Sequence, residues 1–229
     1  MKPLRDWDDL PDFMRTKEVR PYYDIIKEHE KELYLKRAFD VVAASVLLVL
    51  LAPVMLVIAV WIKLDSPGPV FFRQTRITQY GKEFRIFKFR TMVNNADKMG
   101  SAVTVGNDSR ITKVGKIIRK YRIDEFPQLF NVLLGDMSFV GTRPEVPKYV
   151  SAYSDEMYAT LLLPAGITSK TSIEYKDEDL LLKNPDDIDF TYLNVILPEK
   201  MYWNLKGVSE FNVFSELVIM IQTAIAVLK

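Results

Sequence analysis

The residues best suited to chemistry are two adjacent carboxylates, Asp124 and Glu125, which follow a run of basic residues. Arg119 and Arg122 precede the pair, and Arg143 follows within twenty residues. Positive potential from such neighbours keeps a carboxylate ionised. An ionised aspartate can attack phosphorus to form a phospho-enzyme, while a neighbouring carboxylate handles protons or holds a divalent cation. A solvated surface pair or a helix cap has the same spacing, so these residues alone indicate only an anion site with carboxylates.

Composition restricts what else could carry a reaction. The 229-residue chain has no Cys, and its one His, His29, lies in a run of charged residues. Disulfides, thiolate nucleophiles and Cys-ligated zinc or iron–sulfur sites are therefore excluded, and a His-based triad or a multi-His metal site is disfavoured. With 48% apolar and 27% charged residues, the chain can bury a core. Any catalysis must rely on carboxylates, Lys, Arg or hydroxyl groups.

An uncharged apolar run extends from Val41 to Ile62, and Ser45 is its only clearly polar residue. As a helix it would be about 33 Å long, enough to cross a bilayer. Pro53 removes a hydrogen bond near the middle, and the two halves, of about 18 and 14 Å, are each too short to cross. The run therefore predicts membrane attachment, either as a kinked spanning helix or as a bent helix that returns to the same face.

The net charge of +1 conceals a separation of charge after this run. Residues 71–122 contain 13 Lys and Arg against three acids, whereas residues 151–210 contain 11 acids against five Lys. A basic segment directly after a membrane segment has three interpretations. It attracts anionic lipid headgroups, binds nucleic acid, or holds the phosphates of a substrate.

Periodicity and turn residues predict the elements that position these groups. Aromatic and basic residues nearly alternate from Glu83 to Arg90, which is typical of a two-faced strand, and Gly81 marks a turn before it. Thr112 is a suitable N-cap for a helix that runs to Tyr121. Further helices are expected over residues 22–35, 126–134, 149–163, 193–204 and 211–228, and a first strand over residues 70–72. We favour packing of the last helix against the domain over contact with the membrane.

Short motifs in a fixed order make the region from residue 36 to residue 170 recognisable. They are Lys36-Arg37-Ala38-Phe39-Asp40 with Pro53, Ser66-Pro67-Gly68-Pro69, Phe87-Lys88-Phe89-Arg90-Thr91-Met92, Arg110-Ile111-Thr112-Lys113-Val114-Gly115, Asp124-Glu125-Phe126-Pro127-Gln128, Gly135-Asp136-Met137-Ser138-Phe139-Val140-Gly141, Arg143-Pro144 and Gly166-Ile167-Thr168. With these motifs the chain resembles the small monotopic phosphoglycosyl transferases, a family of bacterial sugar transferases that begin glycan assembly on a lipid carrier.

The resemblance implies an α+β fold that is mainly helical. A re-entrant membrane helix, broken at Pro53, would join a compact cytosolic domain with a small β-hairpin and interfacial helices. Residues 1–35 would form a loosely held N-terminal tail and an amphipathic helix, residues 36–64 the re-entrant helix, and residues 65–229 the catalytic domain. The protein would lie at the bacterial inner membrane, with its active site on the cytoplasmic face.

The resemblance also implies a two-step reaction. Asp124 matches the family's nucleophile, which takes a phospho-sugar from a UDP-sugar and releases UMP before a polyprenyl phosphate, typically undecaprenyl phosphate, accepts the phospho-sugar. The family requires Mg²⁺, which Asp124 and Glu125 would hold, and Glu125 would assist in metal or proton handling. Basic residues at the family's phosphate-binding positions are Lys88, Arg119 and Arg143, with Arg76 and Arg90 as weaker matches.

The expected partners are a UDP-sugar, a polyprenyl phosphate and membrane lipids, without nucleic acid, and homo-oligomerisation stays open. The product would start a cell-surface glycan such as a capsule, exopolysaccharide, O-antigen or glycoprotein glycan. Two alternatives are kept. A non-enzymatic membrane scaffold would hold anionic lipid or nucleic acid through its basic segment and would not need Asp124. A metal-dependent hydrolase would cleave the same diphosphates, with water in place of the lipid phosphate.

Overall fold

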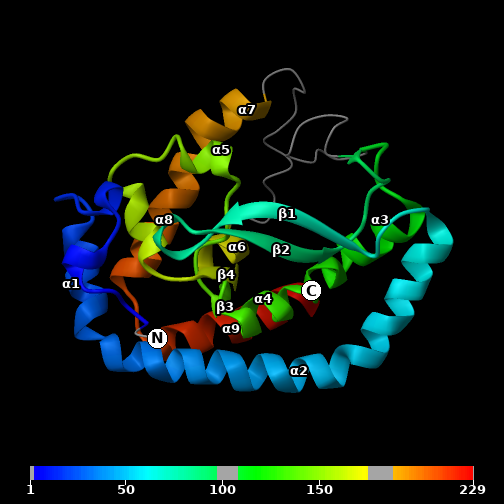
Figure 1. Ribbon diagram of the computed structural model, residues 1–229, viewed down its shortest axis with the longest axis horizontal. Helices are drawn as coiled ribbons and strands as arrows, with labels where there is room; N and C mark the ends of the chain where they lie inside the picture. The colour runs from blue at the N-terminus through cyan, green and yellow to red at the C-terminus, as the bar shows by residue number, and fades with distance from the viewer. Residues whose placement is uncertain (1–2, 97–107, 175–187, 229) are drawn as a thin grey trace.

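The computed structural model describes residues 3–96, 108–174 and 188–228 (Figure 1). Helices predominate in this part of the chain, and its strands form two small two-stranded sheets. The helices are α1 Arg20–Glu28, α2 Glu30–Asp65, α3 Lys113–Lys120, α4 Gln128–Leu134, α5 Pro147–Val150, α6 Lys170–Glu174, α7 Ile188–Thr191, α8 Leu197–Ser209 and α9 Val213–Leu228. The strands are β1 Phe71–Ile77, β2 Glu83–Phe89, β3 Met137–Val140 and β4 Ala165–Thr168. The prediction of a mainly helical fold with a small hairpin is confirmed.

Helix α2 contains the whole apolar run in its 36 residues. It is long and apolar enough to cross a membrane, and only 17% of its most apolar 18-residue stretch is buried within the protein. A core helix of a globular domain would be covered by its neighbours. Helix α2 therefore indicates membrane association.

The path of α2 differs from the prediction in two respects. The helix continues through Pro53 and bends, as Figure 1 shows, so the expected break at this residue is wrong. The amphipathic helix expected over residues 22–35 is confirmed only as far as Glu28, where α1 ends. The chain divides at His29, and the charged residues from Glu30 onward begin α2. A proline inside a helix removes one hydrogen bond, and the intact turns on either side keep the helix continuous.

The first turns of α2 are tied to the domain by buried polar contacts. The Lys36 ammonium group donates to the Glu216 carboxylate of α9 at 2.6 Å, and Arg37 donates to two carbonyl oxygens at the end of α4. The Asp40 carboxylate accepts the backbone N–H of Phe139 in β3. Arg37 thereby gives a donor to the Leu133 carbonyl group, which the end of the helix leaves unpaired, and a second donor to that of Val132. These contacts fix α2 against α4, β3 and α9.

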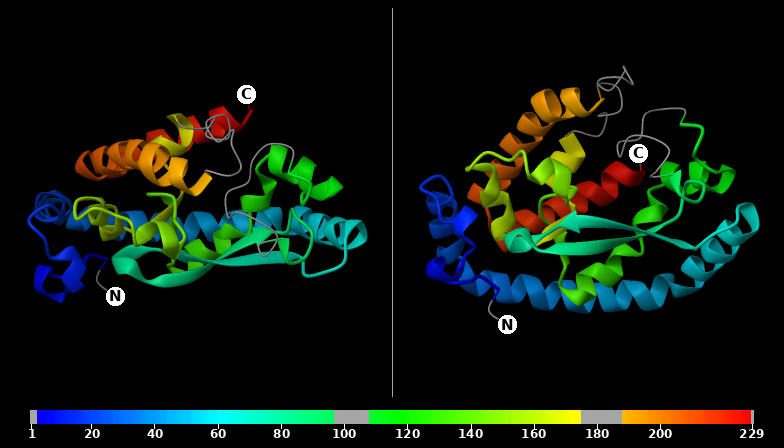
Figure 2. Two further views of the ribbon diagram at one scale, coloured as in Figure 1. Left: turned by 90° about the horizontal axis from the view of Figure 1, so that it is seen from above. Right: turned by 45° about the horizontal axis from the view of Figure 1, so that its top comes forward.

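The residues before α2 belong to the core and are not a loosely held tail. Leu4, Leu10 and Met14 are almost fully buried and share a hydrophobic cluster with Ile77 of β1 and with Leu162. Helix α1 packs on α8, and these helices lie at the end of the molecule opposite to α3 in both views of Figure 2. Two 3₁₀ turns space the buried residues irregularly, so they show neither helical nor strand periodicity.

The two sheets differ in how far apart their strands lie in the sequence. Strands β1 and β2 form an antiparallel hairpin with Phe71 opposite Phe89, whereas β3 and β4 pair in parallel. Gly141 directly follows β3, and Gly166 is the second residue of β4. A Cβ atom on Gly166 would lie 2.2 Å from the backbone nitrogen of Gly141, so only glycine permits this approach.

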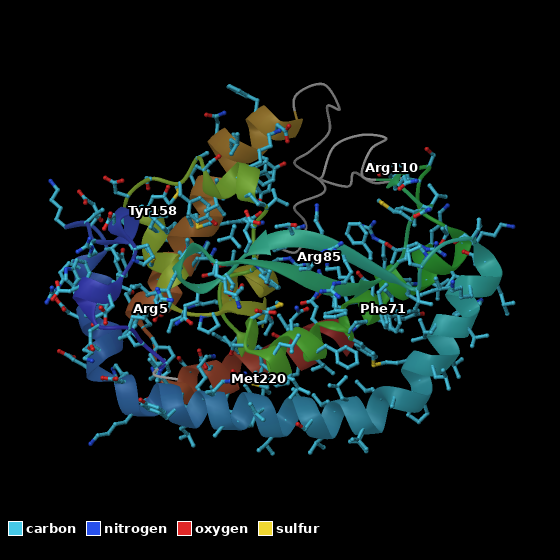
Figure 3. All side chains as sticks on the ribbon, viewed as in Figure 1. Arg5, Phe71, Arg85, Arg110, Tyr158 and Met220 are labelled. Carbon is cyan, nitrogen blue, oxygen red and sulfur yellow. The ribbon has the colours of Figure 1, made fainter. Side chains whose placement is uncertain are left out.

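The remaining helix predictions have mixed outcomes. The Thr112 hydroxyl caps α3 as predicted, and α4 and α9 fall in expected segments. Helix α8 overlaps the expected segment 193–204 but extends to Ser209. The single helix predicted over residues 149–163 is wrong, because α5 ends at Val150 and a separate 3₁₀ segment, Met157–Leu162, follows. Helix α9 packs against the domain, as favoured, partly through Met220, which is labelled in Figure 3.

Candidate active site

The turn that carries Asp124 and Glu125 has a defined backbone geometry. After α3, Arg122 adopts a left-handed conformation with φ of 52°, which reverses the chain direction. The 3₁₀ turn Ile123–Glu125 follows, and Pro127 then stands at the N-terminus of α4, where its fixed φ suits a helix start. The two carboxylates are thus presented between two helices.

A hydrophobic cluster links this turn to the membrane helix. Ile62 of α2, Phe89 of β2 and Ile118 of α3 are buried together, and Ile123 and Phe126 pack against them. The cluster holds the turn, the hairpin and the last part of α2 in one rigid arrangement. The position of α2 is therefore coupled to the position of the carboxylates.

Glu125 is held by two cations that come from different elements. Its Oε1 accepts hydrogen bonds from Arg143 Nη2 at 2.6 Å and from Lys88 Nζ at 3.1 Å. Burial disfavours the ionised carboxyl, but the charges of Arg143 and Lys88 and their hydrogen bonds outweigh it and hold the pKa of Glu125 well below its usual range. The Glu125 charge in turn raises the pKa of Arg143. Glu125 is thus a permanent anion that fixes two cations.

Asp124 has a different environment although it is the adjacent residue. Within the described residues, no N–H or O–H group donates a hydrogen bond to its carboxylate. Burial raises the pKa of Asp124, Lys88 opposes this shift, and Glu125 adds to it. Neighbouring carboxyls whose surroundings separate their pKa values are typical of a division of roles in catalysis. Asp124 is thus the carboxylate of the pair that no described donor occupies.

Both carboxylates line a cavity of about 510 Å³ whose described lining residues are all charged or polar. Its cationic residues outnumber its anionic ones, so the cavity favours a negatively charged ligand. The cations are Lys88, Arg119, Lys120, Arg122, Arg143 and Lys200, and the anions are Asp124, Glu125 and Glu145.

A second cavity, of about 560 Å³, shares Lys88, Arg119 and Asp124 with the first. Its lining differs, because aromatic side chains of the hairpin lie there among arginines. Phe71 and Arg110, which belong to this lining, are labelled in Figure 3. The three shared residues mark the border at which groups bound in the two cavities meet.

Three of the five predicted phosphate-binding residues are brought together at this border or beside it. Lys88, Arg119 and Arg143 all line the first cavity. Arg76 is placed elsewhere, because its guanidinium group donates to the Pro144 carbonyl oxygen and lies 4.0 Å from a carboxylate oxygen of Glu145. It supports the backbone beside Arg143 and does not line either of the two large cavities.

Arg90 borders the second cavity, but its guanidinium group is engaged with backbone. Its side chain is buried and donates to the carbonyl oxygens of Pro67 and Ser66 at 2.6 and 2.7 Å. These carbonyls belong to the loop directly after α2. Arg90 therefore attaches the end of the membrane helix to the hairpin.

The available carboxylate ligands also determine which metal ion the site could bind. Within the described residues, no cluster of three or more His, Asp or Glu side chains is placed to bind a metal ion. Mg²⁺ commonly uses one or two protein carboxylates and takes its other ligands from water and substrate phosphates. Asp124 fits this donor set because no protein donor occupies its carboxylate. Glu125 lies beside it but is already bound by Lys88 and Arg143.

Part of the first cavity comes from the segment after Gly166, where the sequence indicates no individual site residue. The added lining residues are Ser169, Thr171 and Ser172, which follow β4, and Lys200 and Asn204 of α8. The hydroxyl-rich run directly after the Gly166-Ile167-Thr168 motif was the available signal. Its proximity to Asp124 depends on the parallel pairing of β3 with β4, which local patterns do not reveal.

Comparison with known proteins places the chain among bacterial transferases. It is 47% identical over 135 residues to the UDP-N-acetylgalactosamine-undecaprenyl-phosphate N-acetylgalactosaminephosphotransferase of Aeromonas hydrophila, a match that covers 57% of this chain and 32% of that protein. It is 43% identical over 159 residues to the UDP-glucose:undecaprenyl-phosphate glucose-1-phosphate transferase of Escherichia coli K12, which covers 68% of this chain and 34% of that protein. The chain thus spans about a third of the length of these two relatives.

A shorter relative and a family model agree with these matches. The uncharacterized sugar transferase EpsL of Bacillus subtilis is 40% identical over 141 residues, which are 62% of this chain and 69% of EpsL. The family model described as bacterial sugar transferase matches residues 31–229, which include α2, the hairpin and both carboxylates. The resemblance found in the sequence is confirmed, and the chain belongs to the bacterial sugar transferase family.

Proposed function

We propose that this chain transfers a sugar 1-phosphate from a UDP-sugar to undecaprenyl phosphate or a related polyprenyl phosphate and releases UMP. The observation that carries the proposal is the position of Asp124, which borders both cavities while Glu125 beside it is fixed by two cations. The printed names of the Aeromonas and E. coli relatives describe transfers of this kind. The lipid-linked product would begin the assembly of a cell-surface glycan.

In this proposal Asp124 is the nucleophile of two successive displacements. Its carboxylate oxygen attacks the phosphorus that bears the sugar, the bond from that phosphorus to the bridging oxygen breaks, and UMP leaves with the electron pair. An oxygen of the lipid phosphate then attacks the same phosphorus, the bond to Asp124 breaks, and the carboxylate is restored. Covalent catalysis of this type divides one difficult step into two easier ones.

The basic residues support phosphoryl transfer. Such reactions are accelerated mainly by positioning and by charges aimed at the transferring oxygens. Lys88 and Arg143 are oriented by Glu125, and Arg119 forms no ion pair with a carboxylate in the described part of the chain. Glu125 therefore acts largely through the two cations that it holds.

The two cavities suit two different substrates. The polar first cavity suits the diphosphate and the sugar of the donor. The second cavity has an aromatic wall that includes Phe71 and Phe89, which suits a lipid phosphate with its first isoprene units. Arg90 attaches this region to the loop after α2, so a lipid whose tail lies in the membrane would approach beside α2.

We also propose that Mg²⁺ is required and that Asp124 holds it together with the diphosphate, next to Glu125. The ion would supply charge neutralisation and polarisation of the phosphate oxygens. Addition of EDTA should abolish UMP release, and added Mg²⁺ should restore it. Mg²⁺ with UDP should raise the Tm of the wild type but not that of Asp124→Asn, whereas an equal rise in both would exclude Asp124 as a ligand.

We further propose that α2 enters the bacterial inner membrane and returns to its cytoplasmic face. Support comes from the hydrophobic cluster that joins Leu4 and Tyr23, which precede α2, to Ile77 and Leu162, which follow it. A helix that crossed the bilayer would separate these groups by about 30 Å of hydrocarbon.

The topology can be tested because the chain has no native Cys. Single cysteines can be introduced in place of Lys31 and Lys113, which are exposed and lie before and after the apolar run. A membrane-impermeant maleimide should label both from the same side of sealed membrane vesicles. Labelling from opposite sides would exclude the re-entrant arrangement.

The central experiment incubates the purified protein with a UDP-sugar and Mg²⁺ in the absence of lipid acceptor. Stoichiometric UMP and a mass increase of one phospho-sugar on the peptide that contains Asp124 are expected. Asp124→Asn should yield neither, whereas Asp155→Asn, at an exposed position, should behave as the wild type. UMP that appears only with lipid phosphate, without an adduct, would indicate direct displacement. Free sugar phosphate would indicate a hydrolase, and vesicle binding without UMP a scaffold.

A further inference from the structure

We propose that five polar residues form the subsite that binds the sugar of the donor and selects among UDP-sugars, an inference that rests on the proposed function. They are Ser169, Thr171, Ser172, Lys200 and Asn204, which line the first cavity and not the second. The reacting phosphorus must lie near Asp124, at the border of the two cavities. Because the lipid approaches through the second cavity, the sugar on that phosphorus extends toward residues that belong to the first cavity alone.

The chemistry of the first cavity favours a sugar as its occupant. Its described lining contains no aromatic or aliphatic side chain. An apolar group would leave the Asn204 Nδ2 group, whose one described partner is the Met201 sulfur, without a good acceptor, which is costly in a buried site. A sugar instead presents hydroxyl groups that both donate and accept hydrogen bonds.

Thr171 and Asn204 are buried and hold each other in place. The Thr171 hydroxyl donates to Asn204 Oδ1 at 2.8 Å. Within the described residues, the only partner of Asn204 Nδ2 is the Met201 sulfur at 3.8 Å, and sulfur is a weak acceptor. The amide group of Asn204 is therefore held in one orientation and keeps N–H donors for a ligand. Such preorganisation lowers the entropy cost of binding.

The two serines are likewise fixed before any ligand binds. Ser169 Oγ accepts the backbone N–H of Ser172 at 3.0 Å, and the two hydroxyl oxygens lie 3.0 Å apart. This contact holds the first turn of α6 and leaves the hydroxyl groups at the cavity. The subsite is thus built on α6 and α8, not on a free loop.

Lys200 adds a positive charge that the protein compensates. Its Nζ donates to the Tyr192 hydroxyl at 3.1 Å and lies 3.7 Å from Glu145 Oε1. With this charge compensated, the subsite offers hydroxyl and amide groups to its ligand. The favoured donor is therefore a neutral hexose or an acetamido-hexose, and not a uronic acid.

The test measures kcat/KM for UMP release with UDP-glucose, UDP-galactose, their N-acetylated counterparts and UDP-glucuronate, in the presence of undecaprenyl phosphate. Thr171→Val keeps the shape of the side chain and removes its hydroxyl. Asn204→Asp keeps the acceptor for Thr171 and removes both N–H donors. Each variant should reduce the ratio of kcat/KM for the preferred donor to that for the second-best donor by at least about tenfold. The reason is that a site that hydrogen-bonds a substrate discriminates strongly against analogues that lack the bonded group. Thr171→Ser retains the hydroxyl group and should therefore keep most of the wild-type ratio of kcat/KM between the two donors.

Ser209→Ala, at an exposed position of the same helix α8, is the control and should keep both the rate and the ratio. Should Thr171→Val fail to fold, Ser172→Ala gives a second measure of the lost hydroxyl contact. Unchanged ratios in all folded subsite variants, or UDP-glucuronate as the preferred donor of the wild type, would overturn the assignment of the subsite. A wild-type chain that releases UMP from none of the donors would instead refute the proposed function on which the subsite rests.

Discussion

Exchanging each active-site carboxylate for its amide should change stability in opposite senses. Glu125→Gln removes an anion that two cations bind, whereas Asp124→Asn removes an anion to which no described residue donates a hydrogen bond. The amides are nearly isosteric with the acids, so packing is preserved in both variants. The comparison therefore isolates the electrostatic environment of two adjacent residues.

The distances set the size of the effect at Glu125. Its Oε1 lies 2.6 Å from Arg143 Nη2 and 3.1 Å from Lys88 Nζ. Two unit charges about 4 Å apart attract by about 4 kcal/mol at an effective dielectric constant of about 20, so two pairs supply about 8 kcal/mol before the cost of burial. Removal of one partner of a buried pair costs about 3–5 kcal/mol after that cost. The Arg143 side chain is 36% exposed, and water screens its pair, so the lower part of this range is expected.

Thermal unfolding in one detergent, without substrate or Mg²⁺, tests the comparison through the fluorescence of the three Trp residues. A loss of about 3–4 kcal/mol lowers the Tm of Glu125→Gln by roughly 6–16 °C for a chain of this size. For Asp124→Asn no decrease in Tm is expected. A carboxyl whose folded-state pKa is raised loses stability when it ionises above that pKa, so removing its charge should leave the Tm unchanged or raise it. Equal losses in both variants would refute the reasoning.

Three further predictions concern other parts of the site. Arg119→Ala and Arg143→Ala should each lower kcat for UMP release at least about 100-fold, because both residues line the first cavity and in the proposed mechanism stabilise the transferring phosphate. Lys116→Ala, at an exposed position, should not lower kcat, and small equal effects of all three changes in steady-state assays would contradict the proposed role. Arg90→Met should lower the Tm by roughly 3–12 °C, since it removes charge-assisted hydrogen bonds to the carbonyl oxygens of Pro67 and Ser66 that contribute about 1.5–3 kcal/mol. Gly166→Ala should destabilise the fold by about 1–3 kcal/mol because its Cβ would overlap facing backbone, and an unchanged Tm would argue against the close crossing.

The sequence predicts those parts of the site that depend on neighbouring residues. Thr112 caps α3 because a hydroxyl at that position satisfies an N–H of the first turn, whatever the rest of the fold. The segment that contains Lys88, in which aromatic and basic residues alternate, forms strand β2 as expected. A strand places successive side chains on opposite faces, which such a pattern suits. Asp124 and Glu125 lie in one cavity, as adjacent residues in a sharp turn can.

The parts that the sequence did not predict depend on distant contacts. Arg76 and Arg90 resemble Lys88 in charge and spacing, but carbonyl groups of other segments engage their guanidinium groups. The helix predicted over residues 149–163 has a suitable composition, yet Tyr153 is buried in a cluster with residues of α8, and the chain leaves the helical path. Burial of this kind overrides local propensity.

The hydrophobic cluster that joins the two ends of the chain also determines the order in which the protein can form during synthesis. Leu4, Met14 and Ile26 find partners in Leu162 and Val208, which are made much later. At about 5–20 residues per second, roughly 7–30 s separate the synthesis of Ile26 from that of Leu162. Helix α2 is synthesised within this interval. The apolar residues of the first segment thus stay uncovered while α2 is made, until Leu162 and Val208 have been synthesised and the cluster can close.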